Sequence, residues 1–355
     1  MSRRRRTVGI DLFSGAGGMT LGARNAGIDV LYAVEKCRVA AATYKLNFPG
    51  TPMFVGDIRN LKALPSKPKN ARSVLFGGPP CQGFSTSNQR NRSAGNPSNW
   101  LFEEFVRLVH GWNPDCIVME NVKGITQTDG GSFVKIAMDA FAGAGYEVHF
   151  ELLNAVGYGV PQKRTRAFFV GVKENTEFEF PSPETRRSVS VIQAIGDLPL
   201  LSNGASVDEL PYSRRATNKF ARLLRKNKKM VTGNLVTNNN KQVIQRYLHV
   251  PQGGNWEDIP ENLLLNYKDR QRCHTGIYKR LHEGKPSVVI GNFRKNMLIH
   301  PREDRGLSIR EAARIQSLPD DFCFSGSIGF QQQQVGNMVP PLLSQAVFQQ
   351  FKPNE

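Results

Sequence analysis

The chain has 355 residues, 39% of them hydrophobic, and a formal charge of +17 from 47 lysines and arginines against 30 aspartates and glutamates. This length exceeds the roughly 250 to 300 residues at which a single core stops growing, which predicts a larger and a smaller domain. No apolar run reaches the roughly 18 residues that a membrane-spanning helix needs, and Asp11 interrupts the apolar stretch after the basic start. We therefore expect an intracellular protein with a polyanionic partner.

The predicted elements alternate along the first half of the chain. Short apolar runs ending in glycine or an acid predict strands, and longer runs of helix formers between them predict helices. Such alternation is typical of a mostly parallel, helix-covered sheet, with ligand chemistry at the carboxyl ends of its strands. The strands are expected at 7–13, 29–35, 52–57, 73–78, 115–121 and 146–155, and the helices at 18–27, 40–48, 100–112 and 133–145.

The pattern changes after the apolar run RAFFVGV, which places a domain boundary near residue 180. Residues 186–285 hold 18 basic and 8 acidic residues, so this window contributes +10 of the +17. A basic segment of this kind suits the phosphate backbone of a nucleic acid, although a solvated surface is the plainer interpretation. Helical spacing returns at 309–318, and 334–351 is expected to form a loop and a final helix.

The first strand runs into a glycine-rich motif, GIDLFSGAGG. Gly15, Gly17 and Gly18 let the backbone approach a ligand, and Glu35 lies 20 residues beyond Gly15, where a ribose-binding carboxylate belongs. The dinucleotide fingerprint is incomplete because Thr20 takes its last glycine position. The motif therefore indicates a nucleoside cofactor without a pyrophosphate, with Phe13 available to stack on a base. A glycine turn without a ligand is the alternative.

A second motif, GGPPCQGFS, presets one thiol at the end of a strand. The two prolines fix φ for successive residues before Cys81, and the flanking glycines permit a sharp approach. This favours a positioned nucleophile over the more common buried packing cysteine. The other cysteines show no activating context, and an odd set of five without a C-x-x-C pair argues against a disulfide framework and a zinc site.

Two further motifs carry charges next to apolar strands. Glu120 follows CIVM, where it either faces a cleft or caps the next helix, and both remain open. In QKRTR, Arg164 and Arg166 are two residues apart, so on an extended segment both face one side. A solvated sheet edge is the alternative for the arginines.

Taken together, these motifs resemble the bacterial type of DNA (cytosine-5)-methyltransferase. The matches occur in the family's order from residue 10 to about 342: DLFSGAGG, Glu35, GDI, GGPPCQGFS, ENV, QKRTR, REAARIQSLPDDF and QVGNMVPPL. The resemblance implies an α/β fold with a Rossmann-like S-adenosylmethionine-dependent methyltransferase sheet, helices on both faces, and a smaller, irregular, β-rich DNA-recognition domain. The expected domains are a catalytic and cofactor-binding one at 1–180, a target-recognition one at 181–300, and a C-terminal segment at 301–355 that returns to the first.

The resemblance also implies residue roles. Cys81 would attack C6 of cytosine and Glu120 would contact N3, with Arg164 and Arg166 supporting the reaction. Gln82 and Ser85 would lie beside the DNA. The implied S-adenosylmethionine residues are Phe13 against the adenine, Gly15, Gly17 and Gly18 around the amino acid moiety, Glu35 on the ribose, Asp57 and Ile58 at the adenine, and Pro79 and Asn337. The chain departs from many relatives at Lys36, where an aromatic residue is common, and in PSVVIG, where threonine is common.

The implied function is methylation of cytosine C5 in a short duplex DNA sequence, within a restriction-modification or epigenetic system. The expected partner is double-stranded DNA, with a cognate restriction endonuclease as a candidate, no metal, no membrane, and a monomeric enzyme. The expected location is the bacterial cytoplasm, on the nucleoid when DNA is bound. The alternatives are an RNA cytosine methyltransferase, a dehydrogenase, and a DNA-binding protein that has lost activity.

Overall fold

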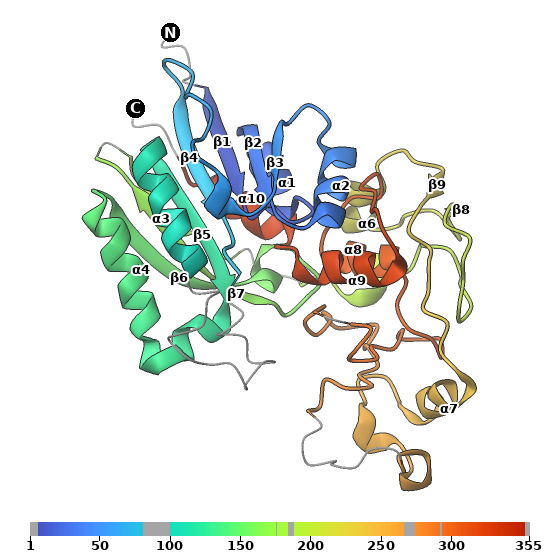
Figure 1. Ribbon diagram of the computed structural model, residues 1–355. Helices are drawn as coiled ribbons and strands as arrows, with labels where there is room; N and C mark the ends of the chain where they lie inside the picture. The colour runs from blue at the N-terminus through green and yellow to red at the C-terminus, as the bar shows by residue number, and fades with distance from the viewer. Residues whose placement is uncertain are drawn as a thin grey trace. The chain divides into compact units, whose positions relative to one another are not determined.

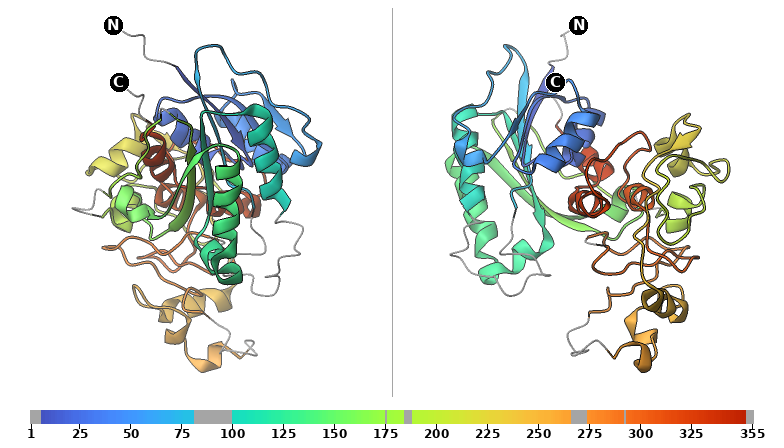
Figure 2. Two further views of the ribbon diagram at one scale, coloured as in Figure 1. Left: turned by 90° about the vertical axis from the view of Figure 1, so that its left-hand side faces the viewer. Right: turned by 45° about the vertical axis from the view of Figure 1, so that its right-hand side comes forward.

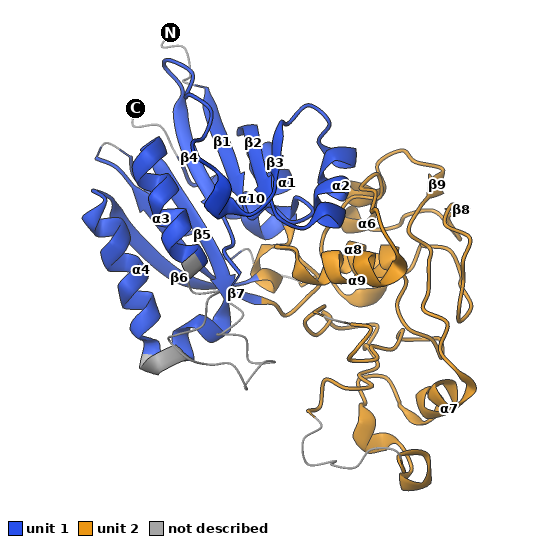
Figure 3. Ribbon diagram, viewed as in Figure 1, with its two compact units in different colours: residues 1–154, 165–183, 341–355 blue, residues 155–164, 184–340 orange. Residues whose placement is uncertain are grey.

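The structure is a computed structural model that describes residues 6–80, 100–174, 176–183, 188–265, 274–291 and 293–351. The chain divides into two compact units (Figure 3). Unit 1 comprises Met1–Asn154, Thr165–Pro183 and Pro341–Glu355, and unit 2 comprises Ala155–Arg164 and Glu184–Pro340. The last helix therefore groups with the N-terminal half of the chain, whereas residues 301–340 group with 184–300.

Unit 1 is built on a seven-stranded sheet of order β3-β2-β1-β4-β5-β7-β6 (Figure 1). Strands β3, β2, β1, β4 and β5 run parallel to one another, and β7 is antiparallel to both β5 and β6. The predicted mostly parallel sheet is thus confirmed. Its strands are β1 Thr7–Leu12, β2 Asp29–Glu35, β3 Met53–Val55, β4 Arg72–Gly77, β5 Cys116–Val122, β6 Glu147–Asn154 and β7 Thr165–Val172.

Helices cover both faces of this sheet, as predicted (Figure 2). Phenylalanines from α3 and α4 join Ile10, Leu75 and Ile117 of the strands in one buried cluster, while α1, α2 and α10 lie on the opposite face. No helix in the described part of the chain is long and apolar enough to cross a membrane. The helices of unit 1 are α1 Gly18–Asn25, α2 Arg38–Asn47, α3 Trp100–Trp112, α4 Ser132–Gly143 and α10 Pro341–Phe348, with 3-10 turns η1 Ile58–Asn60 and η3 Lys123–Gly131.

Unit 2 is irregular, as expected, but the expected β-rich character is wrong. In its described residues the strands β8 Leu210–Pro211 and β9 Met230–Val231 form a two-stranded sheet, and helices predominate. Residues 334–337 were expected in a loop, yet they form the last turn of a helix. The helices are α5 Val191–Ile195, α6 Lys219–Arg225, α7 Lys241–His249, α8 Ile309–Ile315 and α9 Ile328–Asn337, with η4 Ala155–Tyr158, η5 Trp256–Asp258 and η6 Glu261–Leu263.

Buried ion pairs connect the irregular segments of unit 2. Arg314 on α8 is fully buried and bonds Asp320 at 2.6 Å and Asp197 at 2.9 Å. Arg305 pairs with Glu311 at 2.7 Å. Such pairs are costly to break, because removing one partner leaves an uncompensated buried charge.

A buried polar chain ties β1 to the two helices that follow it. The Thr20 hydroxyl donates to Asp11 at 2.6 Å, and the Tyr44 hydroxyl lies 3.0 Å from the same Thr20 oxygen. Burial raises the pKa of Asp11 to about 8, and the nearby Glu35 charge acts in the same direction. A carboxyl therefore stays largely protonated inside the unit near neutrality.

The contact between α1 and α10 depends on a glycine. A Cβ atom on Gly22 would lie 2.0 Å from the Ser344 Oγ and 2.8 Å from the backbone of both Pro341 and Gln345. Backbone cannot rotate away as a side chain can, so only hydrogen fits at this crossing. The glycine thus lets the C-terminal helix pack on the N-terminal part of the chain.

We predict that Gly22→Ala destabilises the protein by about 1 to 3 kcal/mol, because the added methyl overpacks a helix crossing. Urea unfolding measures the change. Gly111→Ala is the matched control, since a Cβ there meets nothing within 4 Å in an exposed part of α3. This control should be neutral or slightly stabilising; equal effects of the two substitutions would contradict the packing account.

We also predict a pH-dependent effect of Asp11→Asn. The Asp11 carboxyl has the ordinary aspartate pKa of about 3.9 in the unfolded chain and a pKa of about 8 in the folded protein, so folding takes up a proton between these pH values. The wild-type free energy of unfolding therefore falls, relative to Asp11→Asn, as the pH rises from about 4 to about 8. Urea unfolding across this range measures the difference. The exposed Asp139→Asn on α4 is the control, and parallel curves for Asp11→Asn would refute the assignment.

Candidate active site

The chemically distinctive residues of unit 1 gather where its parallel strands end. Strands β1, β2, β4 and β5 run the same way, so their carboxyl ends meet at one edge of the sheet. Phe13 follows β1, Glu35 ends β2, Gly78 follows β4, and Glu120 lies near the end of β5. This is the edge at which ligands bind in open α/β sheets.

The loop after β1 turns sharply into α1. Phe13, Gly15 and Gly17 have positive φ values of 59°, 54° and 100°. A Cβ on Gly17 would lie 2.3 Å from the Phe48 ring, so glycine is needed there for both conformation and space. At Gly15 a Cβ would meet nothing within 4 Å, which leaves open space above the backbone. Gly18 begins the helix.

Glu35 joins this loop to the start of α2. Its Oε2 accepts the Gly15 N–H at 2.8 Å and its Oε1 accepts the Cys37 N–H at 2.6 Å. Burial raises the pKa of Glu35 despite these backbone donors. The carboxyl is therefore fixed between two loops at the strand ends.

Asp57 lies at the end of the next loop, capping the short η1 helix. Its carboxylate accepts from Lys36 at 2.9 Å and from Arg59 at 2.6 Å, and hydrogen bonds from Arg59 and then Lys36 hold its pKa well below the usual range. Ile58 beside it is buried. Lys36, where many relatives have an aromatic residue, thus serves as a partner of this acid. Arg59 was missed in the sequence, although a base two residues after an acid is a signal for such a contact.

The segment that leads to Cys81 is held by close backbone approach. A Cβ on Gly77 would lie 1.9 Å from the Leu12 carbonyl oxygen, and one on Gly78 would lie 2.8 Å from the Glu120 Oε2. Asn121 donates from Nδ2 to the Pro79 carbonyl at 3.3 Å. Glycine is therefore a steric requirement at position 77, and a larger residue at position 78 would have to displace the Glu120 carboxylate. Cys81, Gln82 and Ser85 lie outside the described residues.

Glu120 and Arg166 form a buried ion pair under this segment. The Arg166 Nε lies 2.9 Å from the Glu120 Oε1, and the side chains are 13% and 11% exposed. Burial lowers the pKa of Arg166, while the Glu120 charge opposes the shift. The antiparallel pairing of β5 with β7 positions the pair, because Arg166 is registered opposite Val122. Glu120 was expected either to face a cleft or to cap the next helix. In the structure its carboxylate lies beside Gly78, in the segment that leads to Cys81.

Arg164 and Asn337 belong to unit 2. The Arg164 guanidinium is buried and donates to the carbonyl oxygens of Ile290, Gly336 and Met338. Asn337 is the last residue of α9 and is exposed. The structure therefore gives the two arginines of QKRTR different partners.

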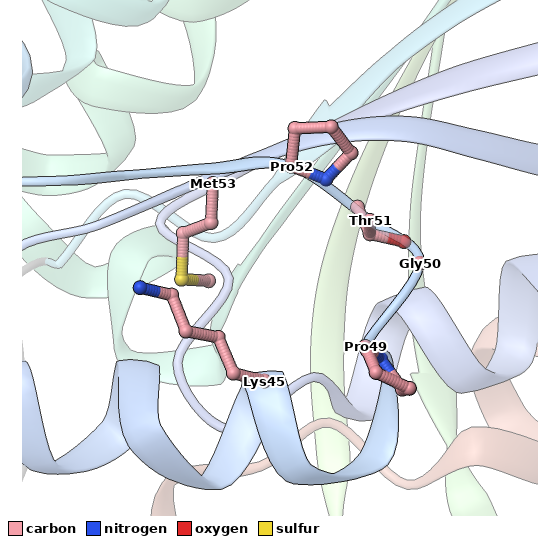
Figure 4. Close-up of a pocket in the computed structure, with 6 residues that line it drawn as sticks. All are labelled: Lys45, Pro49, Gly50, Thr51, Pro52 and Met53. Atoms are coloured by element: carbon pink, nitrogen blue, oxygen red, sulfur yellow. The ribbon is translucent and has the colours of Figure 1, made fainter.

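A surface hollow in the described residues lies away from the carboxyl ends of the parallel strands. It is lined by Lys45, Pro49, Gly50, Thr51, Pro52 and Met53 (Figure 4). It lies before β3 begins, at the amino end of that strand, and the Thr51 hydroxyl already accepts from Arg24 at 2.6 Å. Within the described ranges, no three His, Cys, Asp or Glu side chains are placed to hold a metal ion.

Comparisons with known proteins agree with this geometry. A family model described as C-5 cytosine-specific DNA methylase matches residues 8–353. The type II methyltransferase M1.HphI of Haemophilus parahaemolyticus is 38% identical, over 95% of this chain and 84% of its own. The type II methyltransferase M.DdeI of Desulfomicrobium norvegicum is 34% identical, over 95% and 86%.

Solved structures show the same fold over nearly the whole chain. A prophage-encoded E. coli protein, described as a DNA modification methyltransferase, superposes with a TM-score of 0.77 at 26% identity and covers 97% of both chains. The sequence motifs, the strand-end site and these matches lead to one conclusion. The chain belongs to the C-5 cytosine-specific DNA methylase family, and it is a DNA (cytosine-5)-methyltransferase.

Proposed function

We propose that the protein transfers the methyl group of S-adenosylmethionine to C5 of cytosine in a short duplex DNA sequence, with Cys81 as nucleophile. The observation that carries this proposal is the Glu120–Arg166 pair, which lies directly beneath the loop to Cys81, since Gly78 packs on the Glu120 carboxylate. Covalent catalysis on a pyrimidine needs a thiol as nucleophile, a cation that stabilises its thiolate form, and an acid that contacts the ring.

The strand-end residues fit the cofactor. The open space over Gly15 is a cradle that a Cβ would fill, and Glu35 and Asp57 offer carboxyl oxygens to hydroxyl and amino groups. We propose that Gly15, Gly17 and Gly18 surround the amino acid moiety of the cofactor and that Glu35 binds the ribose. Phe13, Asp57 and Ile58 would contact the adenine. Pro79 and Asn337 would complete the cofactor site. When bound, the cofactor supplies an electrophilic methyl group on a sulfonium.

The chemistry requires a covalent step because C5 of cytosine is a poor nucleophile. Addition of the Cys81 thiolate to C6, with a proton taken up at N3, would make C5 an enamine-like carbon able to accept the methyl group; the S–CH3 bond would break and S-adenosylhomocysteine would leave. A base then removes the C5 proton, and the C6–S bond breaks to release 5-methylcytosine and the thiolate. Thiolate formation near neutrality needs nearby positive charge, for which Arg166 is the candidate in unit 1.

Glu120 would act at N3 of the ring. Addition at C6 sends negative charge toward N3, and a protonated carboxyl can neutralise it. In the free protein Arg166 favours the ionised carboxylate, so we propose that entry of the base excludes water and raises the pKa of Glu120 in the complex. The Glu120 carboxylate would then take up a proton from water as the base enters.

DNA contact would come from unit 2 and from the loop after Cys81. Residues 213–229 carry eight basic and no acidic residues, and most of them are exposed around α6. Lys226 pairs with Asp321 and Arg225 stacks on Tyr212. The candidates for phosphate contacts are the exposed side chains of Arg214, Arg215, Lys219, Arg222, Lys228 and Lys229. The target base must leave the stack, for which we propose the loop with Gln82 and Ser85.

We propose a restriction-modification role, which the type II relatives support. We also propose a cognate endonuclease as partner and a monomeric methyltransferase acting on DNA. An RNA cytosine methyltransferase is the second candidate, because the thiol chemistry is the same. The basic segment of unit 2 favours duplex DNA. Methyl transfer to tRNA but not to duplex DNA would reverse the choice.

The first prediction of this proposal concerns the product. Incubation with mixed-sequence duplex DNA and methyl-labelled S-adenosylmethionine should place label in 5-methylcytosine, measured by nucleoside analysis. Cys81→Ala should abolish the label, while Cys323→Ala, at an exposed cysteine of unit 2, should retain it. Label in DNA that survives Cys81→Ala would exclude this thiol as nucleophile.

The second prediction concerns the ion pair. Glu120→Gln and Arg166→Lys should each lower the single-turnover methylation rate by about 10²-fold or more, because the developing charge loses its partner. Affinity for S-adenosylmethionine should change little. Glu151→Gln, exposed on β6, is the matched control. A Glu120→Gln enzyme with the wild-type rate would rule out the role at N3.

A further inference from the structure

We propose that Arg164 is a positioning residue that fixes the backbone on both sides of Asn337, in place of the catalytic role that the resemblance implies. This inference rests on the proposed cofactor role of Asn337. Its evidence lies within unit 2, which contains both residues.

The guanidinium of Arg164 brackets Asn337. Its Nη2 donates to the carbonyl oxygens of Gly336 at 3.0 Å and Met338 at 2.9 Å, the two residues that flank Asn337. Its Nη1 donates to the Ile290 carbonyl at 3.1 Å. Arg164 is 1% exposed, so these bonds form in a dry environment where charged donors are strong. One side chain therefore sets the path of the chain into and out of residue 337.

Gln162 strengthens the same arrangement. It lies two residues from Arg164, and its Oε1 accepts the Ile290 N–H at 2.8 Å while its Nε2 donates to the Gln316 Oε1 at 2.8 Å. Gln316 in turn donates to the Val335 carbonyl at 2.8 Å. Both glutamines are fully buried. The carbonyls of residues 335, 336 and 338 are thus all held by buried side chains.

Steric contact leaves this segment little freedom. A Cβ on Gly336 would lie 2.1 Å from the Gly291 carbonyl oxygen, so the end of α9 packs directly on the backbone at 290–291. Asn337 itself is exposed. A fixed backbone that presents an exposed amide is the arrangement expected for a ligand-binding side chain whose position matters.

The geometry also explains why arginine stands at position 164. Three carbonyl oxygens in different directions need a planar group with several donors, and a lysine ammonium on a flexible stem cannot reproduce that fork. Loss of the donors would leave buried carbonyls to find new partners, and the turn at Asn337 would shift. A displacement of about 1 Å at a binding group can cost up to about 10²-fold.

The test measures S-adenosylmethionine binding by calorimetry without DNA. Arg164→Lys should raise the Kd about tenfold, and methylation should recover as the cofactor concentration rises, so that KM changes more than kcat. Lys163→Met, which removes a charge from the exposed neighbouring position, is the control and should leave the Kd unchanged. Arg166→Lys should show the opposite pattern, a lower rate with little change in Kd.

A double-mutant cycle with Asn337→Ala separates positioning from a general structural role. If Arg164 acts through Asn337, the double variant binds the cofactor as Asn337→Ala alone does. Independent, additive losses would overturn the proposal, as would an unchanged Kd for Arg164→Lys with a lost single-turnover rate at saturating cofactor. An unchanged Kd for Asn337→Ala would also overturn it. Absence of methyl transfer to DNA by the wild-type protein would instead refute the proposed function.

Discussion

The site depends on how closely β4 approaches β1 where both strands end. Only hydrogen fits at Gly77, because a Cβ there would lie 1.9 Å from the Leu12 carbonyl oxygen, whereas a Cβ on Gly78 would meet the Glu120 carboxylate at 2.8 Å. These contacts fix where the chain leaves the sheet toward Cys81. The parallel order of β2, β1, β4 and β5 then brings Glu35 and Glu120 to the same edge. The glycine-rich loop after β1, the Glu35 carboxyl and the Glu120 carboxyl thus come together at one edge through the packing of the strands.

Charge in this protein is used in two physically different ways. Buried arginines organise backbone and carboxylates, as Arg164 does at the end of α9 and Arg314 does on α8. Exposed lysines and arginines around α6 remain in water, where they suit a polyanion and contribute little to stability. The net charge of +17 therefore favours a polyanionic partner, whereas the buried arginines hold parts of the fold together.

The sequence predicted the sheet and its helices because apolar periodicity is strong from β1 to β6, and it predicted the family because its motifs occur together. The β-rich recognition domain that the family resemblance implied was wrong for unit 2. Its structure depends on side-chain hydrogen bonds between distant residues, such as those from Arg310 to the carbonyls of Thr232 and Phe322. The sequence also treated Arg164 and Arg166 alike, since two residues of spacing cannot tell which partners lie opposite. The buried Asp11 carboxyl was likewise invisible, because its protonation follows from burial.

The covalent step at Cys81 can be trapped on duplex DNA that carries a fluorinated cytosine. Fluorine at C5 of cytosine cannot leave as the C5 proton does, so the adduct should persist after methyl transfer. The protein is incubated with S-adenosylmethionine and duplex DNA containing 5-fluorocytosine, and peptides are mapped by mass spectrometry. We expect a cofactor-dependent adduct at Cys81. An adduct at Cys37 or Cys323, or methyl transfer to unmodified DNA with no adduct on the fluorinated duplex, would contradict it.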